Sequence, residues 1–213
     1  VADCTGHGIP GAFMSVLGVS TLNEIIAETD EDQSAAEILN ILRDKVTASL
    51  KKRKGDIVSE AGMDLALIII DRQNRKLQFA GANNPLFLIR KRQHSLRLPD
   101  NEKLEKTVYA DLELNHIKAD KMPIGIYPVT KPFYNHEFQY MPNDSLYIFS
   151  DGLSDQMGGE HGKKLLNKRF KAGLLKMQNK NMEEQKEILE KFLIKWKNRL
   201  PQTDDIIVFG IRL

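Results

Sequence analysis

The spacing of hydrophobic and polar residues changes several times along the chain, and each change marks a predicted element. In residues 9–27 apolar side chains recur at helical spacing, which predicts a helix. A second helix is predicted over residues 34–50, because Ser34 and Glu37 have the spacing of a capping box. After Met63 come three apolar runs of strand length, LALIIID, LQFAGA and PLFLIRK, which predict three strands in a meander. The apolar stripe predicted for the first helix consists of Phe13, Met14, Leu17, Leu22, Ile25 and Ile26.

The second half of the chain mixes short strands with two longer helical patterns. Weak strand signals surround Val108 and Ile117, FYNHEFQY alternates like a half-exposed strand, and SLYIF is a buried strand that stops before Asp151. Helical spacing returns in residues 164–177 and 182–200, and DDIIVFGIRL predicts a last strand. Antiparallel runs of strands with helices inserted in pairs favour an α+β sandwich of two stacked antiparallel sheets flanked by helical pairs over a parallel doubly wound sheet.

Composition narrows the class of protein. The 213 residues are 41% hydrophobic, enough for a core, and no linker or repeat divides them, so we expect one domain over residues 1–213. The 31 Lys and Arg nearly cancel the 29 Asp and Glu. The chain therefore has no strong positive electrostatic field that would bind nucleic acid or an anionic membrane. The single cysteine, Cys4, excludes a disulfide framework and a Cys-rich zinc site and fits a reducing, cytoplasmic compartment. We find neither a signal peptide nor a stretch near the ~20 apolar residues that span a bilayer, so we expect no membrane contact.

Acidic residues stand at the ends of three predicted strands. Asp3 follows two apolar residues, Asp151 follows LYIFS, and Asp204 with Asp205 precedes IIVFGI. Converging carboxylates repel one another and raise each other's pKa values, so a divalent cation is their natural complement. Oxygen ligands favour magnesium, manganese or calcium over zinc. The alternative is that these are ordinary turn and cap residues, because Asp-Gly is a common turn pair.

The opening stretch, VADCTGHGIPGAF, places three glycines around the start of the first helix. Gly6, Gly8 and Gly11 allow the backbone to approach another group closely, and the positive end of the helix dipole favours an anion such as phosphate. Close packing of the helix on a sheet would require the same glycines. Both interpretations stay open.

Five motifs, in this order, carry a family resemblance: DCTGHGIPGAFMS, FAGANNPL, MPIG, FSDGLSDQMGGEHGKK and QTDDIIVFGIR. Together they resemble the SpoIIE/RsbU branch of the metal-dependent (PPM, protein phosphatase 2C-like) phosphatases over essentially the whole chain. The resemblance implies a two-sheet sandwich with two Mn²⁺ or Mg²⁺ ions at one end. By motif match, Asp3 resembles the metal-bridging aspartate, the Cys4 carbonyl a ligand of the first metal, and Asp151 and Asp204 ligands of the second, with Asp205 beside them.

The resemblance also suggests roles for less certain positions. His7 is a candidate proton donor to the leaving seryl or threonyl oxygen, although the family's eukaryotic branch has its proposed acid at the position of Thr5 and a structural role in the loop is the simpler interpretation of His7. Asn83 and Asn84 could line the substrate cleft or form a turn before a proline. Asp64 could be a further metal ligand, but a turn residue is the favoured interpretation. The first two helices resemble elements that couple an upstream sensor to metal occupancy.

The chain departs from the family pattern at its start. A Gly-Asp-aromatic motif expected upstream is absent, and only two apolar residues precede Asp3, so we expect an N-terminally truncated fragment of reduced activity, with sheet edges that permit a homodimer. The expected function is hydrolysis of phosphoserine or phosphothreonine on a bacterial regulatory protein, such as an anti-sigma-factor antagonist, by the output domain of a larger signalling protein. The alternative is a catalytically silent module that binds a phosphorylated partner or relays a signal. A metal-dependent nuclease is disfavoured, because the chain lacks a basic, aromatic-lined surface pattern.

Overall fold

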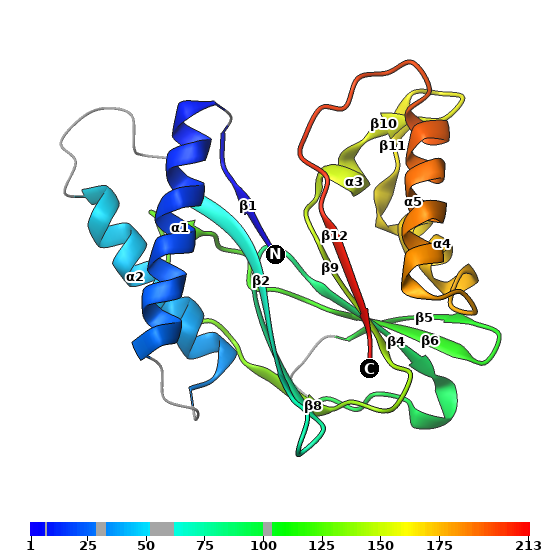
Figure 1. Cartoon of the computed structure of the whole chain (residues 1–213), viewed down its shortest axis with the longest axis horizontal. Coiled ribbons are helices and arrows are strands. Elements are labelled where there is room, and N and C mark those ends of the chain that lie inside the picture. The colour runs from blue at the N-terminus through cyan, green and yellow to red at the C-terminus, as the bar shows by residue number, and fades with distance from the viewer. Residues whose placement is uncertain (7, 29–32, 52–61, 100–103) are drawn as a thin grey trace. The chain divides into compact units, whose positions relative to one another are not determined.

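The computed structural model describes residues 1–6, 8–28, 33–51, 62–99 and 104–213. The chain forms two compact units, and each has its own sheet, helices and core (Figure 1). Unit 1 consists of Val1–Pro85 and Lys118–Gln139. Unit 2 consists of Leu86–Ile117 and Tyr140–Leu213.

Unit 1 is an antiparallel sheet with two helices. Its strands follow the order β1-β2-β3-β8, and β7 also pairs with β2. The elements are β1 (Ala2–Cys4), α1 (Ile9–Glu28), α2 (Ala35–Lys51), β2 (Gly62–Asp71), β3 (Lys76–Ala82), β7 (Ile124–Gly125) and β8 (His136–Gln139).

The second helix of unit 1 follows its sequence pattern closely. The predicted capping box is confirmed, because the Ser34 backbone N–H donates to Glu37 Oε2 at 2.8 Å and the Glu37 N–H donates to Ser34 Oγ at 3.3 Å. The buried face of α2 includes Leu39, Leu42 and Val46. Each fully buried side chain of this size contributes about 1.5–3 kcal/mol relative to an exposed one, so the core of unit 1 depends on this face.

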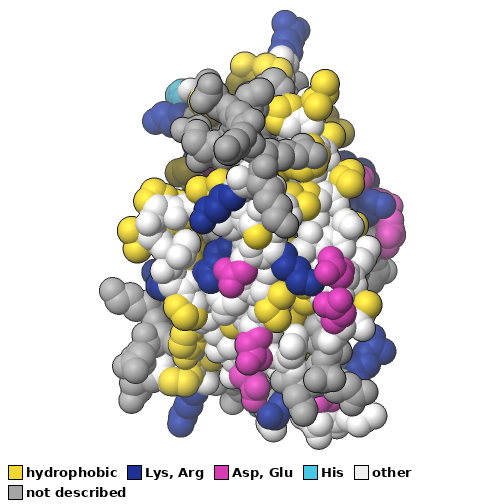
Figure 2. Space-filling model, turned by 90° about the vertical axis from the view of Figure 1, so that its left-hand side faces the viewer, with side chains coloured by type: hydrophobic (Ala, Val, Ile, Leu, Met, Phe, Trp, Pro, Cys, Tyr) yellow, Lys and Arg dark blue, Asp and Glu magenta, His cyan; other side chains and the backbone are white. Residues whose placement is uncertain are grey.

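The first helix is apolar on more than one face. Met14 and Ile25 are buried in the core of unit 1, whereas Ile26, which we expected in the same stripe, is 55% exposed. Figure 2 shows hydrophobic side chains among charged ones on the face that carries α1 and α2. Among the described helices, α1 alone is long and apolar enough to cross a membrane by length and composition, which corrects the expectation that no stretch approaches this limit.

Unit 2 is a second antiparallel sheet, in the order β12-β9-β4-β6-β5. Phe87, Phe149 and Phe170 lie together in its core, with ring centroids 4.6–5.9 Å apart. Its elements are β4 (Leu86–Lys91), η1 (Arg92–His94), β5 (Glu105–Tyr109), β6 (Leu112–Ile117), β9 (Ser145–Phe149), α3 (Gly152–Asp155), β10 (Met157–Gly158), β11 (Lys163–Lys164), α4 (Leu166–Lys176), α5 (Met182–Lys197) and β12 (Val208–Arg212).

The structure confirms the α+β class with antiparallel sheets but corrects the predicted meander. Strands β2 and β3 pair as expected, whereas β4 pairs with β6 and β9 in the other sheet. Asn83 has a left-handed φ of 60°, the Asn84 N–H turns back to the Ala82 carbonyl at 2.7 Å, and Pro85 has no N–H to donate to a ladder. The pairing therefore ends at this turn, and the chain continues into unit 2.

Candidate metal centre

In unit 2, one serine ties together the two segments that carry the predicted aspartates. Ser150, between β9 and Asp151, donates its hydroxyl to the Asp205 carbonyl at 2.9 Å and accepts the Ile207 N–H at 3.0 Å. Its backbone N–H also donates to the Ile207 carbonyl at 3.1 Å. Because Ser150 is completely buried, these bonds fix the loop before β12 against the end of β9.

The structure explains why a glycine, Gly152, follows Asp151. A Cβ at this position would lie 2.3 Å from the Asp205 carbonyl oxygen, closer than any side chain allows. The glycine therefore permits backbone contact between Gly152 and Asp205, which are 53 residues apart in the sequence. From the sequence alone, a turn preference could explain the Asp-Gly pair. In the structure, the glycine is required instead by its close contact with the Asp205 backbone.

The carboxylates gathered at this point repel one another. The pKa of Asp151 is raised, first by burial and then by the charges of Asp204 and Asp155, while Lys164 opposes the shift. Carboxylates held together in this way are stabilised when a cation lies among them. The charge of Asp204 thus acts on Asp151, and Asp205 follows Asp204 in the same loop.

Two charged residues of this group were not recognised in the sequence. Asp155 lies one helical turn after Asp151, and its N–H donates to the Asp151 carbonyl at 2.9 Å. Lys164 of β11 donates to Asp155 Oδ2 at 2.7 Å. The four-residue spacing of the two aspartates was a visible signal, because such residues share a helix face. Nothing in the local pattern marked Lys164, which reaches the group only through the β10–β11 hairpin.

Unit 1 holds a second pair of acidic residues. Asp3 lies in β1 directly opposite Asp64 of β2, so Asp64 is a strand residue and the turn interpretation is wrong. Asn83 donates from Nδ2 to Asp64 Oδ1 at 2.8 Å. Its neighbour Asn84 is only 4% exposed. Carboxylates directly opposite each other on one face of a sheet are unfavourable unless a cation or a hydrogen-bond donor compensates.

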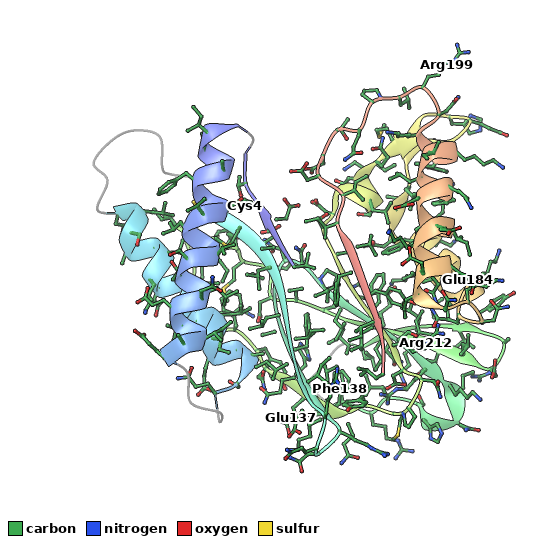
Figure 3. The ribbon with its side chains drawn as sticks, in the orientation of Figure 1. Cys4, Glu137, Phe138, Glu184, Arg199 and Arg212 are labelled. Carbon is green, nitrogen blue, oxygen red and sulfur yellow. The ribbon has the colours of Figure 1, made fainter. Side chains whose placement is uncertain are left out.

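The position of Cys4 in β1 determines where its carbonyl points. Val1 and Ala66 exchange both backbone hydrogen bonds, and Thr5 donates to the Gly62 carbonyl at 2.9 Å. Because hydrogen-bonded pairs alternate in an antiparallel ladder, the Cys4 carbonyl is directed away from β2 at the edge of the sheet. The Cys4 thiol accepts the Ser15 hydroxyl at 3.4 Å, and Figure 3 shows Cys4 beside α1.

The glycines that follow β1 fold the loop onto the first turn of α1. Gly6 and Gly8 have φ values of 89° and 70°, and a Cβ on Gly11 would lie 2.4 Å from the Gly6 carbonyl oxygen. This arrangement matches the close-packing interpretation of the glycines, here of loop against helix. His7, the candidate proton donor, lies outside the described residues.

The predicted ligands are divided between the two units. Asp3 and Cys4 belong to unit 1, whereas Asp151, Asp204 and Asp205 belong to unit 2. Within the described ranges, no group of three or more His, Cys, Asp or Glu side chains forms a metal site as placed. The donors present in both units are carboxylate and carbonyl oxygens, the set that fits Mg²⁺ or Mn²⁺.

Comparison with known proteins gives consistent results. The family model of Stage II sporulation protein E (SpoIIE) matches residues 1–213. The SiaA-PP2C domain of Pseudomonas aeruginosa is similar at 27% identity and a TM-score of 0.78, over 100% of this chain and 74% of that one. The PP2C phosphatase domain of SpoIIE from Bacillus subtilis, solved with a fragment of its regulatory domain, gives 18% identity and a TM-score of 0.65, over 100% and 53% of the two chains.

A further solved structure is the catalytic domain of the serine/threonine protein phosphatase PstP in complex with two manganese ions. It gives 15% identity and a TM-score of 0.61, over 100% of this chain and 86% of that one. At this identity the likeness concerns the fold alone. None of the curated protein sequences matches the chain.

Proposed function

The chain belongs to the SpoIIE family, and from this premise we propose that it hydrolyses phosphoserine or phosphothreonine on a bacterial regulatory protein, such as an anti-sigma-factor antagonist. The family predicted from the five motifs is thereby confirmed, and the chain is a phosphatase domain of the PP2C type. The regulatory substrate and the dependence on two Mn²⁺ or Mg²⁺ ions are our proposal. We further propose that residues 1–213 form one domain, and that it is the output domain of a larger cytoplasmic signalling protein.

The observation that carries the proposal is the tie between β9 and the loop before β12. Ser150 and Gly152 hold Asp151 next to the Asp204–Asp205 loop, and the charge of Asp204 contributes to the raised pKa of Asp151. A protein does not gain stability from grouping like charges in this way. A module without metal chemistry would have no use for this group, which disfavours the catalytically silent alternative.

Each ligand has a proposed role. By the family resemblance, Asp3 and the outward Cys4 carbonyl of unit 1 would hold the first ion, Asp151 and Asp204 of unit 2 would hold the second, and Asp3 would be shared by both. When bound, the ions supply a water nucleophile at neutral pH and neutralise charge on the phosphoryl oxygens. Asp204 is favoured over Asp205, because the Asp204 charge acts on Asp151. The Asp204 carboxylate also accepts the Asp205 N–H at 2.8 Å, which orients it.

The remaining steps are the cleavage of the phosphate ester bond and the protonation of the leaving oxygen. Water adds to phosphorus, the bond from phosphorus to the seryl or threonyl oxygen breaks, and that oxygen takes up a proton. His7 is proposed as the donor because an imidazole can donate a proton near neutral pH. If His7 donates the proton, kcat should decrease at alkaline pH, where the imidazole is deprotonated. In His7→Ala this decrease should be absent, and an unchanged pH profile would contradict the proposed role.

The outward face of α1 supports a regulated domain. Ile9, Val16, Val19 and Ile26 are 55–87% exposed and recur at seven- and three-residue spacing, which places them on one face. We propose that an upstream sensor segment of the parent protein covers this face. In the parent protein, replacing Val16 and Val19 by Ser should uncouple activity from the upstream segment, and an unchanged response would contradict the proposal.

The activity itself is tested with a phosphoserine peptide and Mn²⁺ on the parent protein. Asp3→Asn and Asp151→Asn should each lower kcat by about a hundredfold to a thousandfold, because a charge-stabilising group of this kind contributes roughly 3–4 kcal/mol to the transition state. Asp44→Asn, a matched change at an exposed position of α2, should leave kcat unchanged. Equal activity in all four proteins would refute the proposal, and inactivity of the wild type under saturating Mn²⁺ would favour the silent module.

A further inference from the structure

Unit 2 contains a hollow at the end of the sheet opposite to the acidic group. Its volume is about 470 Å³, which is in the range of small-molecule sites. It lies where β9 begins, next to Asp144, and the five residues of β9 separate it from the Asp151 end by roughly 16 Å. The walls come from β4, η1, β6, the 141–144 turn, Gln178 and the end of β12.

The charges that line the hollow do not cancel. The acidic side chain is Asp144, which is already paired with Arg90, and both side chains are at most 3% exposed. Lys91 and Arg212 are the other cations of the lining, and neither has an ion pair among the described residues. His94 adds an imidazole at the same wall. The lining side chains therefore carry an excess of positive charge, opposed in part by the terminal carboxyl group of Leu213, which accepts the Asn143 N–H at 2.6 Å.

Arg212 is held in place by two acceptors that leave part of its guanidinium available. Nε donates to Ser145 Oγ at 3.2 Å and Nη2 donates to the Gln178 carbonyl at 3.0 Å. Within the part of the chain that the structure describes, Nη1 has no hydrogen-bond acceptor. A guanidinium oriented in this way is preorganised for a planar or tetrahedral oxyanion, because it offers parallel N–H groups. Figure 3 labels Arg212 on β12.

The uncharged part of the lining mixes apolar side chains with the polar Gln93, Asn143 and Gln178. Ile89, Leu112, Met141 and Pro142 contribute to the wall beside the cations. An inorganic anion would leave this surface unfilled, whereas an organic body covers it and gains from its burial. We propose that the hollow is a binding site for a small organic oxyanion, a phosphate or carboxylate on an apolar body, with Arg212 binding the oxyanion and Lys91 adding charge at the rim.

The site is tested by calorimetry on the chain in EDTA, so that bound metal cannot contribute. The probes are phenyl phosphate, benzoate and phenol. Phenyl phosphate or benzoate should bind with a dissociation constant at or below the millimolar range, and the tighter of the two identifies the preferred oxyanion. Phenol should not bind measurably, because it lacks the charge. If neither anion binds at millimolar concentration, or if phenol binds equally well, the proposal is wrong.

Variants locate the binding and separate it from the proposed phosphatase centre. Arg212→Gln should weaken binding about tenfold to a hundredfold, as expected for a lost charged hydrogen bond, and Arg212→Lys should fall between. Lys91→Gln, at the exposed rim, should weaken anion binding about threefold. If the Arg212 variants do not fold, the Lys91 variant tests whether the anion binds in this hollow. Asp151→Asn should bind like the wild type, whatever its phosphatase activity. Equal binding by wild type, Arg212→Gln and Lys91→Gln, or loss of binding in Asp151→Asn, would overturn the assignment.

Discussion

Strand β9 has an aspartate near each end, and the surroundings of the two differ. Asp144, before β9, is 1% exposed, is paired with Arg90 and accepts the Met141 N–H at 2.9 Å. Asp151, after β9, is exposed at its surface but partly desolvated, and the charges of Asp204 and Asp155 act on it. The protein supplies the counter-charge at the first end and leaves the second end short of it. The structural carboxylate and the proposed ligand therefore differ in what neutralises them.

The largest effect is expected when the buried pair is broken. Asp144→Asn leaves the Arg90 charge buried without its partner and should lower the free energy of unfolding by about 3–5 kcal/mol. The double variant Arg90→Met with Asp144→Leu should recover most of the loss, because no charge is left buried. Urea unfolding of the metal-free chain measures both. A loss below about 1 kcal/mol for Asp144→Asn would remove the distinction between the two ends of β9.

A smaller effect, on metal affinity, is expected at Lys164, a cation whose charge acts on the carboxylates of Asp151 and Asp155. Its ion pair with Asp155 offsets part of the negative charge, so Lys164→Gln should tighten Mn²⁺ binding. Because the Lys164 side chain is 51% exposed, screening limits the gain to about two- to fivefold at low salt. Lys163→Gln, the neighbouring lysine of β11, is the control in a calorimetric titration. If both variants bind Mn²⁺ equally, Lys164 has no special position in this group.

The smallest effect concerns stability without metal. Since the folded-state pKa of Asp151 is raised, its charge costs stability at neutral pH, and the cost disappears as the pH falls below the unfolded-state pKa of about 4. Asp151→Asn should therefore stabilise the metal-free chain by about 0.5 kcal/mol at pH 7 after allowance for solvent screening, and by nothing near pH 3. Urea unfolding at the two pH values tests this, with Asp44→Asn as control. Destabilisation at pH 7 would mean that the protein already satisfies Asp151.

Local patterns in the sequence predicted most of the elements. The capping box of Ser34 and Glu37 and the end of β9 depend on neighbouring residues, which the sequence displays directly, whereas β12 begins only at Val208 and not directly after Asp205 as predicted. The sheet to which β4 belongs was not predictable, because apolar runs indicate burial but not the pairing partner. The strand-end pattern also selected Asp151, which follows β9 after Ser150, and Asp204, which lies four residues before β12, and their role as ligands stays a prediction.

The parts of the site that escaped prediction depend on contacts across long stretches of chain. Ser150 bonds to Asp205, which is 55 residues away, and Arg90 pairs with Asp144 across 54 residues. Asp144 precedes its strand much as Asp151 follows it, so strand ends alone cannot separate a structural aspartate from a proposed ligand. That distinction required the tertiary structure.

The most direct test of the central claim is a calorimetric Mn²⁺ titration of the wild-type chain and of Asp3→Asn, Asp151→Asn and Asp44→Asn. We expect the wild type and Asp44→Asn to bind Mn²⁺ with the same affinity, and the other two variants to lose at least about tenfold, because each removes a proposed ligand. Failure of the wild type to bind Mn²⁺ at millimolar concentration, or affinities of Asp3→Asn and Asp151→Asn equal to that of Asp44→Asn, would contradict the account.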